Sequence, residues 1–312
     1  MSRYIFGIDI GGTTVKCGLF TAQGELLEKW EIPTRRENKG ENVLPDVADT
    51  ILKKLAERGL PKEEIAGIGV GIPGPVRADG TVLKCANLGW GITPANRMLE
   101  ELTGLPVRVA NDANVAALGE MWKGGGRGYE DVVMVTLGTG VGGGIIIGGR
   151  VVAGSNGAGG EIGHLVINPE ETAVCGCGGH GHLEQYASAT GIVRMAKKRL
   201  AEDDAPTKLR EFEELTAKNI FDCAKEQDAV AAGLADLLGS YLAAALRHIA
   251  AVVDPQVFVI GGGVSRAGDI LLDAIRRHYN ENILYALKDK EFRLAELGND
   301  AGIYGSARLL ID

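Results

Sequence analysis

Apolar residues along this chain fall into short strand-like runs separated by segments with helical spacing. Residues 4–20 and 131–152 each hold two runs rich in β-branched residues around a glycine turn, a pattern that predicts a β-hairpin. Three further short apolar runs end in turn residues and predict buried strands, at 65–73, 106–112 and 257–263. Strands that alternate with helices in this way predict an α/β fold.

Two segments favour helices. Val47, Ile51 and Leu55 recur at a spacing of four residues, and Gly59 follows them where a helix would end. The most apolar late segment, 241–253, contains charged residues and is shorter than the ~20 apolar residues of a membrane span. We expect this segment to form a buried helix, in a protein that has no membrane partner.

The second hairpin repeats the plan of the first. The turn 138–140 stands where the first hairpin has 11–13, which predicts an internal duplication. At 312 residues the chain is larger than one hydrophobic core usually supports, so we expect two lobes. The smaller lobe should hold residues 1–114 and about 300–312, and the larger lobe should hold residues 115–299.

Composition and charge exclude several classes of protein. The chain has 33 basic and 41 acidic residues and a net charge of −8, which argues against a nucleic-acid partner. The N-terminus lacks the pattern of a signal peptide, because Asp9 stands where apolar residues are needed. Of five cysteines only Cys175 and Cys177 are close in sequence, which favours a metal site over a disulfide framework. We therefore expect a cytoplasmic protein.

The two glycine turns are candidate phosphate sites. Glycine lets backbone amides approach a phosphate without a side-chain clash, and a threonine hydroxyl adds a donor. Asp9, just before the first turn, can bind hydrated Mg²⁺. Both turns lead into another strand, which excludes the P-loop and the Rossmann fingerprint. The candidate residues for binding ATP and its Mg²⁺ are Asp9, Gly11, Gly12, Thr13, Thr14, Lys16, Gly138, Thr139, Gly140, Gly262 and Gly263.

Several of these candidates have a second interpretation. A glycine turn can simply join two twisted strands, and Lys16 can be a solvated strand residue. Gly262 and Gly263 lie between a predicted strand and a helix expected to begin near Ser265. This junction can pass beneath a nucleoside or can serve only as the entry to the helix.

Asp112 is the candidate general base. It follows the predicted strand 106–112 and precedes a helical pattern, so its carboxylate should lie at the edge of a sheet where α/β proteins bind ligands. A carboxylate there can accept the proton of an attacking hydroxyl. An aspartate before a helix can equally be an N-cap.

Eight motifs occur here in the order in which they occur in the ROK family of bacterial sugar kinases. They are DIGGTTVKCGL, GIPGPV, NLGW, ANDANVAALGE, LGTGVGGGII, GAGGEIGH, CGCGGHGHLE and VIGGGVS, from Asp9 to Ser265. The resemblance implies a two-lobed actin-like ATPase fold, related to ribonuclease H, with duplicated hairpin and βα units. It also implies transfer of the γ-phosphoryl group of ATP to the 6-hydroxyl of glucose. The alternative acceptors are other hexoses, such as N-acetylmannosamine or fructose.

The resemblance also implies further properties of this chain. ROK repressors carry an N-terminal DNA-binding segment, and the first hairpin begins at Tyr4, so we expect an enzyme rather than a sugar-sensing repressor. A homodimer or homotetramer is the expected assembly. Asp112 would be the catalytic base, and the residues that bind the sugar would be Gly74, Asn87, Asn111, Asp112, Glu161, His164 and Glu184.

The segment between Glu161 and Glu184 predicts a zinc site. Cys175 and Cys177 can bind one ion as thiolates. ROK proteins resembling this chain have a Gly-His followed by C-x-C-G-x-x-G-C, and here His182 replaces the third cysteine. The implied ligands are therefore His164, Cys175, Cys177 and His182, with His180 as the competitor for the fourth position. Four protein ligands leave zinc no open position, so the ion should be structural. Reduced cysteines beside surface histidines are the alternative.

Overall fold

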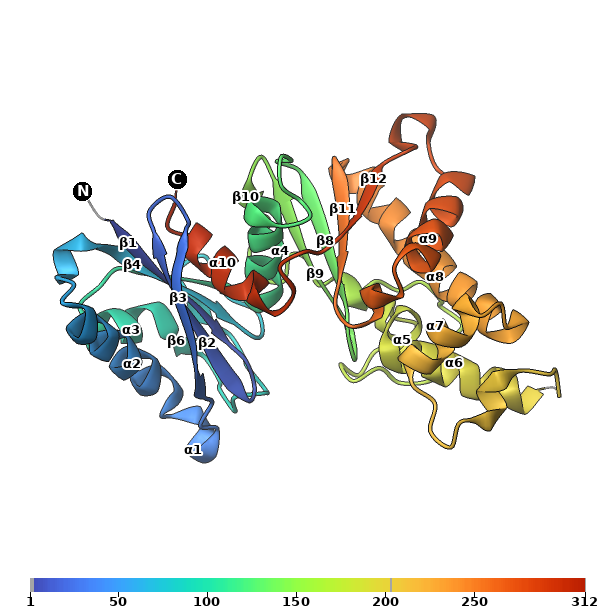
Figure 1. Ribbon diagram of the computed structural model, residues 1–312, viewed down its shortest axis with the longest axis horizontal. Helices are drawn as coiled ribbons and strands as arrows, with labels where there is room; N and C mark the ends of the chain where they lie inside the picture. The colour runs from blue at the N-terminus through green and yellow to red at the C-terminus, as the bar shows by residue number, and fades with distance from the viewer. Residues whose placement is uncertain (1–2, 203, 312) are drawn as a thin grey trace. The chain divides into compact units, whose positions relative to one another are not determined.

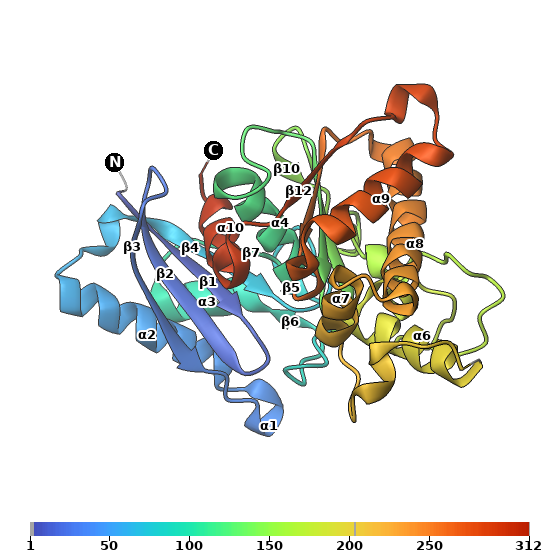
Figure 2. The same cartoon turned by 45° about the vertical axis from the view of Figure 1, so that its right-hand side comes forward.

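The computed structural model describes residues 3–202 and 204–311. The chain divides into two compact units, which Figures 1 and 2 show from two directions. The first unit holds the residues up to Glu130, then Gly144–Gly160 and the C-terminal segment from Leu297. The second unit holds Asp131–Gly143 and Glu161–Glu296.

The first unit is built on a five-stranded sheet with the order β3-β2-β1-β4-β7. The first three strands form an antiparallel meander, and β4 and β7 run parallel to β1. The strands are β1 (Tyr4–Ile10), β2 (Thr14–Thr21), β3 (Leu26–Pro33), β4 (Ile65–Ile72) and β7 (Val107–Asn111). A separate two-stranded pair consists of β5 (Thr81–Val82) and β6 (Thr93–Pro94).

Helices cover both faces of this sheet. Ile8 of β1 belongs to the core formed with α2 and α3, whereas Ile5 packs against Ile303 of α10. Because side chains alternate along a strand, Asp9 lies on the face of β1 that α10 covers. The helices of this unit are α1 (Glu37–Gly40), α2 (Val43–Arg58), α3 (Ala95–Thr103), α4 (Asp112–Lys123) and α10 (Ala301–Arg308), with 3₁₀ turns η1 (Lys62–Glu64) and η6 (Gly298–Asp300).

The second five-stranded sheet has the order β10-β9-β8-β11-β12. Its strands β8, β11 and β12 are parallel, and β10 pairs with β9 in the antiparallel sense. The strands are β8 (Val132–Leu137), β9 (Val141–Ile147), β10 (Arg150–Val151), β11 (Val257–Gly261) and β12 (Glu291–Leu294). The β1-β2-β3 hairpins of the first sheet and the β8-β9-β10 hairpins of the second therefore take the same places, so the predicted duplication is confirmed.

The helices of the second unit follow the long loop after β10. They are α5 (Glu184–Ala187), α6 (Ala189–Glu202), α7 (Ala217–Lys225), α8 (Ala229–Val253) and α9 (Asp269–Glu281), with 3₁₀ turns η2 (Ile162–His164), η3 (Lys208–Glu211), η4 (Val264–Ala267) and η5 (Tyr285–Leu287). α8 packs against α7 and α9, which Figure 1 shows on the same side of this sheet.

α8 is the helix expected at 241–253, but it begins earlier, at Ala229. The side chain of Asp228 caps it by accepting a hydrogen bond from the amide of Ala231 at 3.0 Å. α8 is long and apolar enough to cross a membrane by composition alone, and 56% of its most apolar window is buried inside the protein. The apolar face of α8 contributes to the core of the second unit, as in many soluble proteins.

Two boundaries differ from the expectations. The helix expected near Ser265 begins at Asp269, because residues 264–267 form a 3₁₀ turn that ends at Gly268, where φ is +72°. The lobe boundary expected after residue 114 falls inside α4, and the whole helix groups with the first unit. α4 packs closely against α10, where a side chain at Gly305 would collide with the backbone of Val115.

Candidate active site and metal cluster

The first glycine turn is held by its own hairpin and by Thr34. The amide of Gly11 donates to the carbonyl of Thr14 at 3.0 Å. Thr34 donates twice, from its hydroxyl to the Gly11 carbonyl at 2.7 Å and from its amide to the Thr13 carbonyl at 2.9 Å. Within residues 3–202 and 204–311, the amides of Gly12 and Thr13 have no hydrogen-bond partner. Adjacent free amides of this kind form a site for an anion.

Asp9 lies beside this turn, against Gly302 of α10. A side chain at Gly302 would come within 2.5 Å of the Asp9 carboxylate. Burial raises the pKa of Asp9 to about 6, the positive charge of Lys16 opposes this rise, and the negative charge of Asp112 adds to it. Lys16 faces Asp9 across the β1–β2 pair and donates to the carbonyl of Asn299 at 3.0 Å. The sequence candidates Asp9 and Lys16 are thus neighbours, and Asp112 is close enough to affect Asp9.

Asn111 and Asp112 stand where β7 ends and α4 begins. The N-cap of α4 is Asn111, whose Oδ1 accepts from the amide of Asn114 at 3.1 Å. The alternative role of Asp112 as N-cap is therefore wrong. Asn111 Nδ2 donates to Asp112 Oδ1 at 3.0 Å and to the carbonyl of Gly74 at 3.1 Å. The structure thereby brings together the three predicted residues Gly74, Asn111 and Asp112.

The carboxylate of Asp112 is half-buried, and among the described residues its hydrogen bonds go to Oδ1 alone. Burial raises its pKa, and hydrogen bonds from Ala113 and Asn111 oppose the rise. Both of these bonds go to Oδ1, at 2.8 Å from the Ala113 amide and 3.0 Å from Asn111. Oδ2 is therefore the oxygen that can accept a proton. Asn87, a predicted sugar residue, is exposed and lies beside Gly12 of the first turn.

The second glycine turn repeats the arrangement of the first. The Gly138 amide donates to the Gly140 carbonyl at 3.0 Å, and the Gly138 carbonyl accepts from the amide of Ala189 at 2.8 Å. The hydroxyl of Thr190 donates to the Thr139 carbonyl at 2.7 Å. In the described part of the chain, the amides of Thr139 and Gly140 have no partner.

The third glycine cluster adjoins the second turn. Gly262 has a φ of +83°, and a side chain there would lie within 2.5 Å of the carbonyl oxygen of Leu137, the residue before Gly138. Gly263 is exposed and has open space where a side chain would be. Residues 262 and 263 therefore come close to 138–140 within the second unit, although the sequence separates them by more than a hundred positions.

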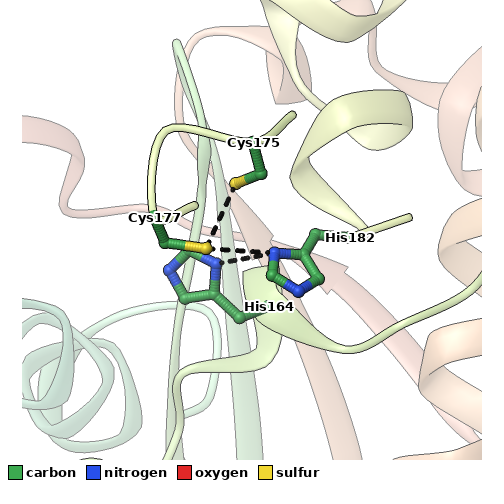
Figure 3. A group of neighbouring side chains, drawn as sticks. All are labelled: His164, Cys175, Cys177 and His182. Atoms are coloured by element: carbon green, nitrogen blue, oxygen red, sulfur yellow. Dashed lines mark hydrogen bonds between the residues drawn. The ribbon is translucent and has the colours of Figure 1, made fainter. Parts of the chain in front are cut away.

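The four predicted metal ligands form one cluster, in which their side chains point toward one another (Figure 3). The candidate ligand atoms of His164, Cys175, Cys177 and His182 all lie within 4.8 Å of one another. The sulfurs of Cys175 and Cys177 are 3.6 Å apart. His182 Nδ1 lies 3.3 Å from the Cys177 sulfur and 3.4 Å from Nδ1 of His164.

These distances fit a tetrahedral zinc ion. Bonds of about 2.3 Å to sulfur and 2.1 Å to nitrogen place two sulfurs about 3.8 Å apart and two nitrogens about 3.4 Å apart. His180 is exposed and does not belong to the cluster found among the described residues, so the geometry favours His182. The loop is folded by backbone bonds, including Cys175 N to Gly179 O at 2.7 Å and Leu183 N to Leu165 O at 2.9 Å.

Glu184 links this cluster to the second turn. Its Oε1 accepts from the thiol of Cys175 at 2.8 Å and lies 4.0 Å from His164 Nδ1. Its Oε2 faces Gly140, where a side chain would come within 2.6 Å of it. A cavity of about 380 Å³ opens between Thr139, Gly140, the loop segment 173–176 and Glu184. Glu161 is exposed, at the start of η2.

The comparison with known families identifies the chain. A model of the ROK family matches residues 5–312. This chain belongs to the ROK family. The chain is 44% identical to a relative from Halalkalibacterium halodurans named glucokinase, with 99% of this chain and 95% of the relative covered.

Solved ROK structures are similar to this chain throughout. A ROK hexokinase from Thermus thermophilus has a TM-score of 0.80 and 34% identity, over 97% of this chain and 96% of that chain. A ROK family glucokinase from Streptomyces griseus, in complex with glucose and AMPPNP, has a TM-score of 0.73 and 34% identity, over 98% of both chains. The actin-like fold class expected from the sequence is confirmed.

Three polar residues beside the ROK turns were missed by the sequence analysis. Thr34 holds the first turn, and Thr190 and Ser188 lie beside the second. No local motif singles them out, because each is distant in sequence from the turn beside which it lies. Of the three, only Thr34 directly follows the third strand of a repeat, so a search for hydroxyl residues at that place would have found Thr34 but not Ser188 or Thr190.

Proposed function

We propose that this protein is an ATP-dependent glucokinase, which transfers the γ-phosphoryl group of ATP to the 6-hydroxyl of glucose. The observation that carries the proposal is the half-buried carboxylate of Asp112, with a raised pKa and a free oxygen, on the same sheet as an amide-lined turn. The relatives named glucokinase, and the solved glucokinase with glucose and AMPPNP, support the choice of substrates.

Asp112 is the proposed general base. As the 6-hydroxyl oxygen forms its bond to the γ-phosphorus, Oδ2 of Asp112 takes the hydroxyl proton, the bond from phosphorus to the bridging oxygen breaks, and ADP leaves. The side-chain amide of Asn111 donates to Oδ1 of Asp112 and holds this oxygen in place. The carbonyl of Gly74 accepts a second hydrogen bond from the same amide and fixes its orientation. Since both amide hydrogens of Asn111 are used, it has one lone pair on Oδ1 for a sugar hydroxyl.

The first turn is proposed to bind phosphate oxygens together with a magnesium ion. Asp9 supplies a carboxylate near that of Asp112, and two such groups close together favour a cation between them or beside them. When bound, Mg²⁺ supplies positive charge that offsets the negative charge of the phosphates. Gly11, Gly12, Thr13, Thr14 and Lys16 supply the surrounding donors.

The second unit is proposed to contribute both to nucleotide binding and to sugar binding. The free amides of Thr139 and Gly140 suit phosphate oxygens, and Gly138, Gly262 and Gly263 leave room beside them. Glu161, His164 and Glu184 suit sugar hydroxyls. A carboxylate accepts hydrogen bonds from hydroxyl groups, and an imidazole nitrogen can either donate or accept one.

The cluster of His164, Cys175, Cys177 and His182 is proposed to hold a structural zinc ion. Its four donors complete a tetrahedron and leave no position for water, so the ion would stabilise the loop that precedes Glu184. Reduced thiolates are required, which suits a cytoplasmic protein.

We also propose a homodimer or homotetramer, which light scattering of the purified protein would test.

An assay over a panel of sugars tests the proposed function. Purified protein is given ATP or polyphosphate with glucose, N-acetylmannosamine or fructose, and ADP release and sugar phosphate are both measured. We expect ATP with glucose to give the highest kcat/KM. Phosphorylation of N-acetylmannosamine alone would make this a kinase for another hexose. ATP binding without any transfer would contradict the proposal.

A further inference from the structure

Both turns are held from outside by the hydroxyl group of a threonine. Thr34 donates to the carbonyl of Gly11 at 2.7 Å, and Thr190 donates to the carbonyl of Thr139 at 2.7 Å. The two threonines come from different elements, since Thr34 follows β3 and Thr190 lies in the first turn of α6. A threonine hydroxyl therefore holds a carbonyl in each turn, at the first residue of the first turn and at the second residue of the second turn, from residues that the duplication does not relate.

The direction of these bonds fixes where the free amides point. In a trans peptide the carbonyl and the following N–H point in opposite directions. A carbonyl of Thr139 turned toward Thr190 therefore turns the Gly140 amide away from α6. The bond from Ala189 to the Gly138 carbonyl turns the Thr139 amide away as well. Both free amides thus face the same side, as an anion site requires.

The first turn follows the same rule. The carbonyl of Gly11 points toward the Thr34 hydroxyl, so the amide of Gly12 points away from it. Thr34 is buried, and its own amide holds the Thr13 carbonyl in addition. A single residue therefore fixes two peptide groups of this turn.

Ser188 lies beside Thr190 and binds the backbone of Glu184. The hydroxyl of Ser188 donates to the carbonyl of Glu184 at 2.6 Å and lies 3.0 Å from the Thr190 hydroxyl. It also accepts from the amide of Gly191 at 2.9 Å. Because the Ser188 proton goes to Glu184 and the Thr190 proton goes to Thr139, no proton lies between the two hydroxyls, and Ser188 only packs against Thr190.

We propose that Thr34 and Thr190 are positioning residues, each of which holds its own turn with the free amides directed at phosphate oxygens of a nucleotide. The inference rests on the proposed function, because it takes the anion to be ATP. Neither hydroxyl needs to touch the nucleotide. Without either hydroxyl, the peptide group that it holds can rotate. Binding of the nucleotide must then also order the turn, which costs free energy and weakens the affinity.

Binding measurements on Thr190→Val and Thr190→Ser test this. Thr190 is exposed, so its variants should fold. We measure the Kd of a nonhydrolysable ATP analogue with Mg²⁺, the Kd of glucose, and the melting temperature. Thr190→Val should weaken nucleotide binding about 10-fold, which corresponds to about 1.4 kcal/mol. Thr190→Ser should stay within about two-fold of wild type because it retains the hydroxyl, and the Kd of glucose should not change.

A matched control removes a similar bond elsewhere. Ser240 donates to the carbonyl of Leu237 at 2.8 Å within α8, and Ser240→Ala should leave the Kd of the nucleotide unchanged. Thr34→Val and Thr34→Ser repeat the comparison for the first turn. If Thr34→Val does not fold, the Thr190 pair decides the inference alone.

Three outcomes overturn the inference. The first is wild-type nucleotide affinity in Thr190→Val, and the second is equal loss in Thr190→Val and Thr190→Ser, which would indicate packing of the methyl group. The third is a parallel loss of nucleotide binding, glucose binding and melting temperature. Wild-type protein that binds the analogue but transfers no phosphoryl group to glucose contradicts the proposed function alone, since the inference is judged on nucleotide affinity.

Discussion

The two repeats of this protein share a backbone arrangement but differ in the side chains around it. Both sheets have the same strand order, and both turns present two free amides. Two residues before the first glycine, however, the first repeat has Asp9 and the second has Thr136. The second repeat has instead the loop with the metal cluster, which ends at Glu184. Duplication has thus kept the backbone of the turn, whereas the carboxylate of Asp9 and the Cys/His cluster are each specific to one repeat.

The largest effect should come from Asp112, the proposed general base, which lies in the first repeat. Asp112→Asn keeps the size of the side chain but removes the proton acceptor, so we expect kcat to fall by about 10²–10⁴-fold. The KM for ATP should change little. Steady-state kinetics at saturating glucose measure this. Thr136→Val, at the place in the second repeat that matches Asp9, should stay within about three-fold of wild type. A variant Asp112→Asn with wild-type turnover would show that Asp112 is not the base.

The metal cluster of the second repeat gives the next effect. Wild-type protein should contain about one zinc ion per chain. His182→Ala should weaken zinc binding by at least about 10–100-fold, and competition with a chelator measures the change. His180→Ala is the matched control, because His180 lies outside the cluster and should keep full occupancy. Loss of zinc in His180→Ala together with full occupancy in His182→Ala would reverse the assignment of the fourth ligand.

Asp9 should make the stability of the nucleotide-free protein depend on pH. Its pKa is raised from 3.8 to about 6, chiefly by burial, so the folded protein binds more protons than the unfolded chain between these values. The stability that protonated Asp9 contributes to the folded protein is fully present below pH 3.8 and is lost as the pH rises through about 6. A shift of one pKa unit corresponds to ~1.4 kcal/mol, and solvent screening of the partly exposed Asp9 reduces this value. Asp9→Asn should therefore stabilise the protein at pH 7.5 by about 1–2 kcal/mol.

Thermal unfolding at several pH values measures this gain. The difference between Asp9→Asn and wild type should shrink as the pH falls from 7.5 to 5, and Thr136→Asn should show no such trend. Mg²⁺ with nucleotide should stabilise wild type more than Asp9→Asn. A gain that is constant over this range of pH would contradict the raised pKa.

The strands and turns could be predicted because they depend on local sequence. Short apolar runs and glycine turns predicted both hairpins, and Gly59 predicted the end of α2, where its φ of +62° confirms a left-handed cap. The capping of α4 could not be predicted in the same way. Asn111 and Asp112 are adjacent and both suit an N-cap, and only the tertiary contact of Asn111 with Gly74 decides between them.

Contacts between distant segments also lay beyond the sequence. The link from Thr34 to Gly11 joins residues 23 positions apart, and the link from Thr190 to Thr139 spans 51. Isolated hydroxyl residues occur throughout the chain, so these two could not be distinguished from the others. The cluster of Cys175, Cys177, His164 and His182 was predictable because its cysteines and histidines are concentrated in one short segment, whereas the zinc ion itself stays a prediction.

The smallest effect should distinguish the neighbours of the two turns. A methyl group at Gly140 would come within 2.6 Å of Glu184 Oε2, whereas a methyl group at Gly12 would lie 3.9 Å from Cβ of Asn87, an ordinary contact. Gly140→Ala should therefore displace the carboxylate proposed to bind sugar. Loss of about 1 kcal/mol of hydrogen bonding would raise the KM for glucose about five-fold. Gly12→Ala should leave the KM for glucose unchanged and affect only the KM for ATP. If Gly140→Ala leaves the KM for glucose as low as Gly12→Ala does, displacement of the Glu184 carboxylate does not affect glucose binding. Glu184 would then not bind the sugar.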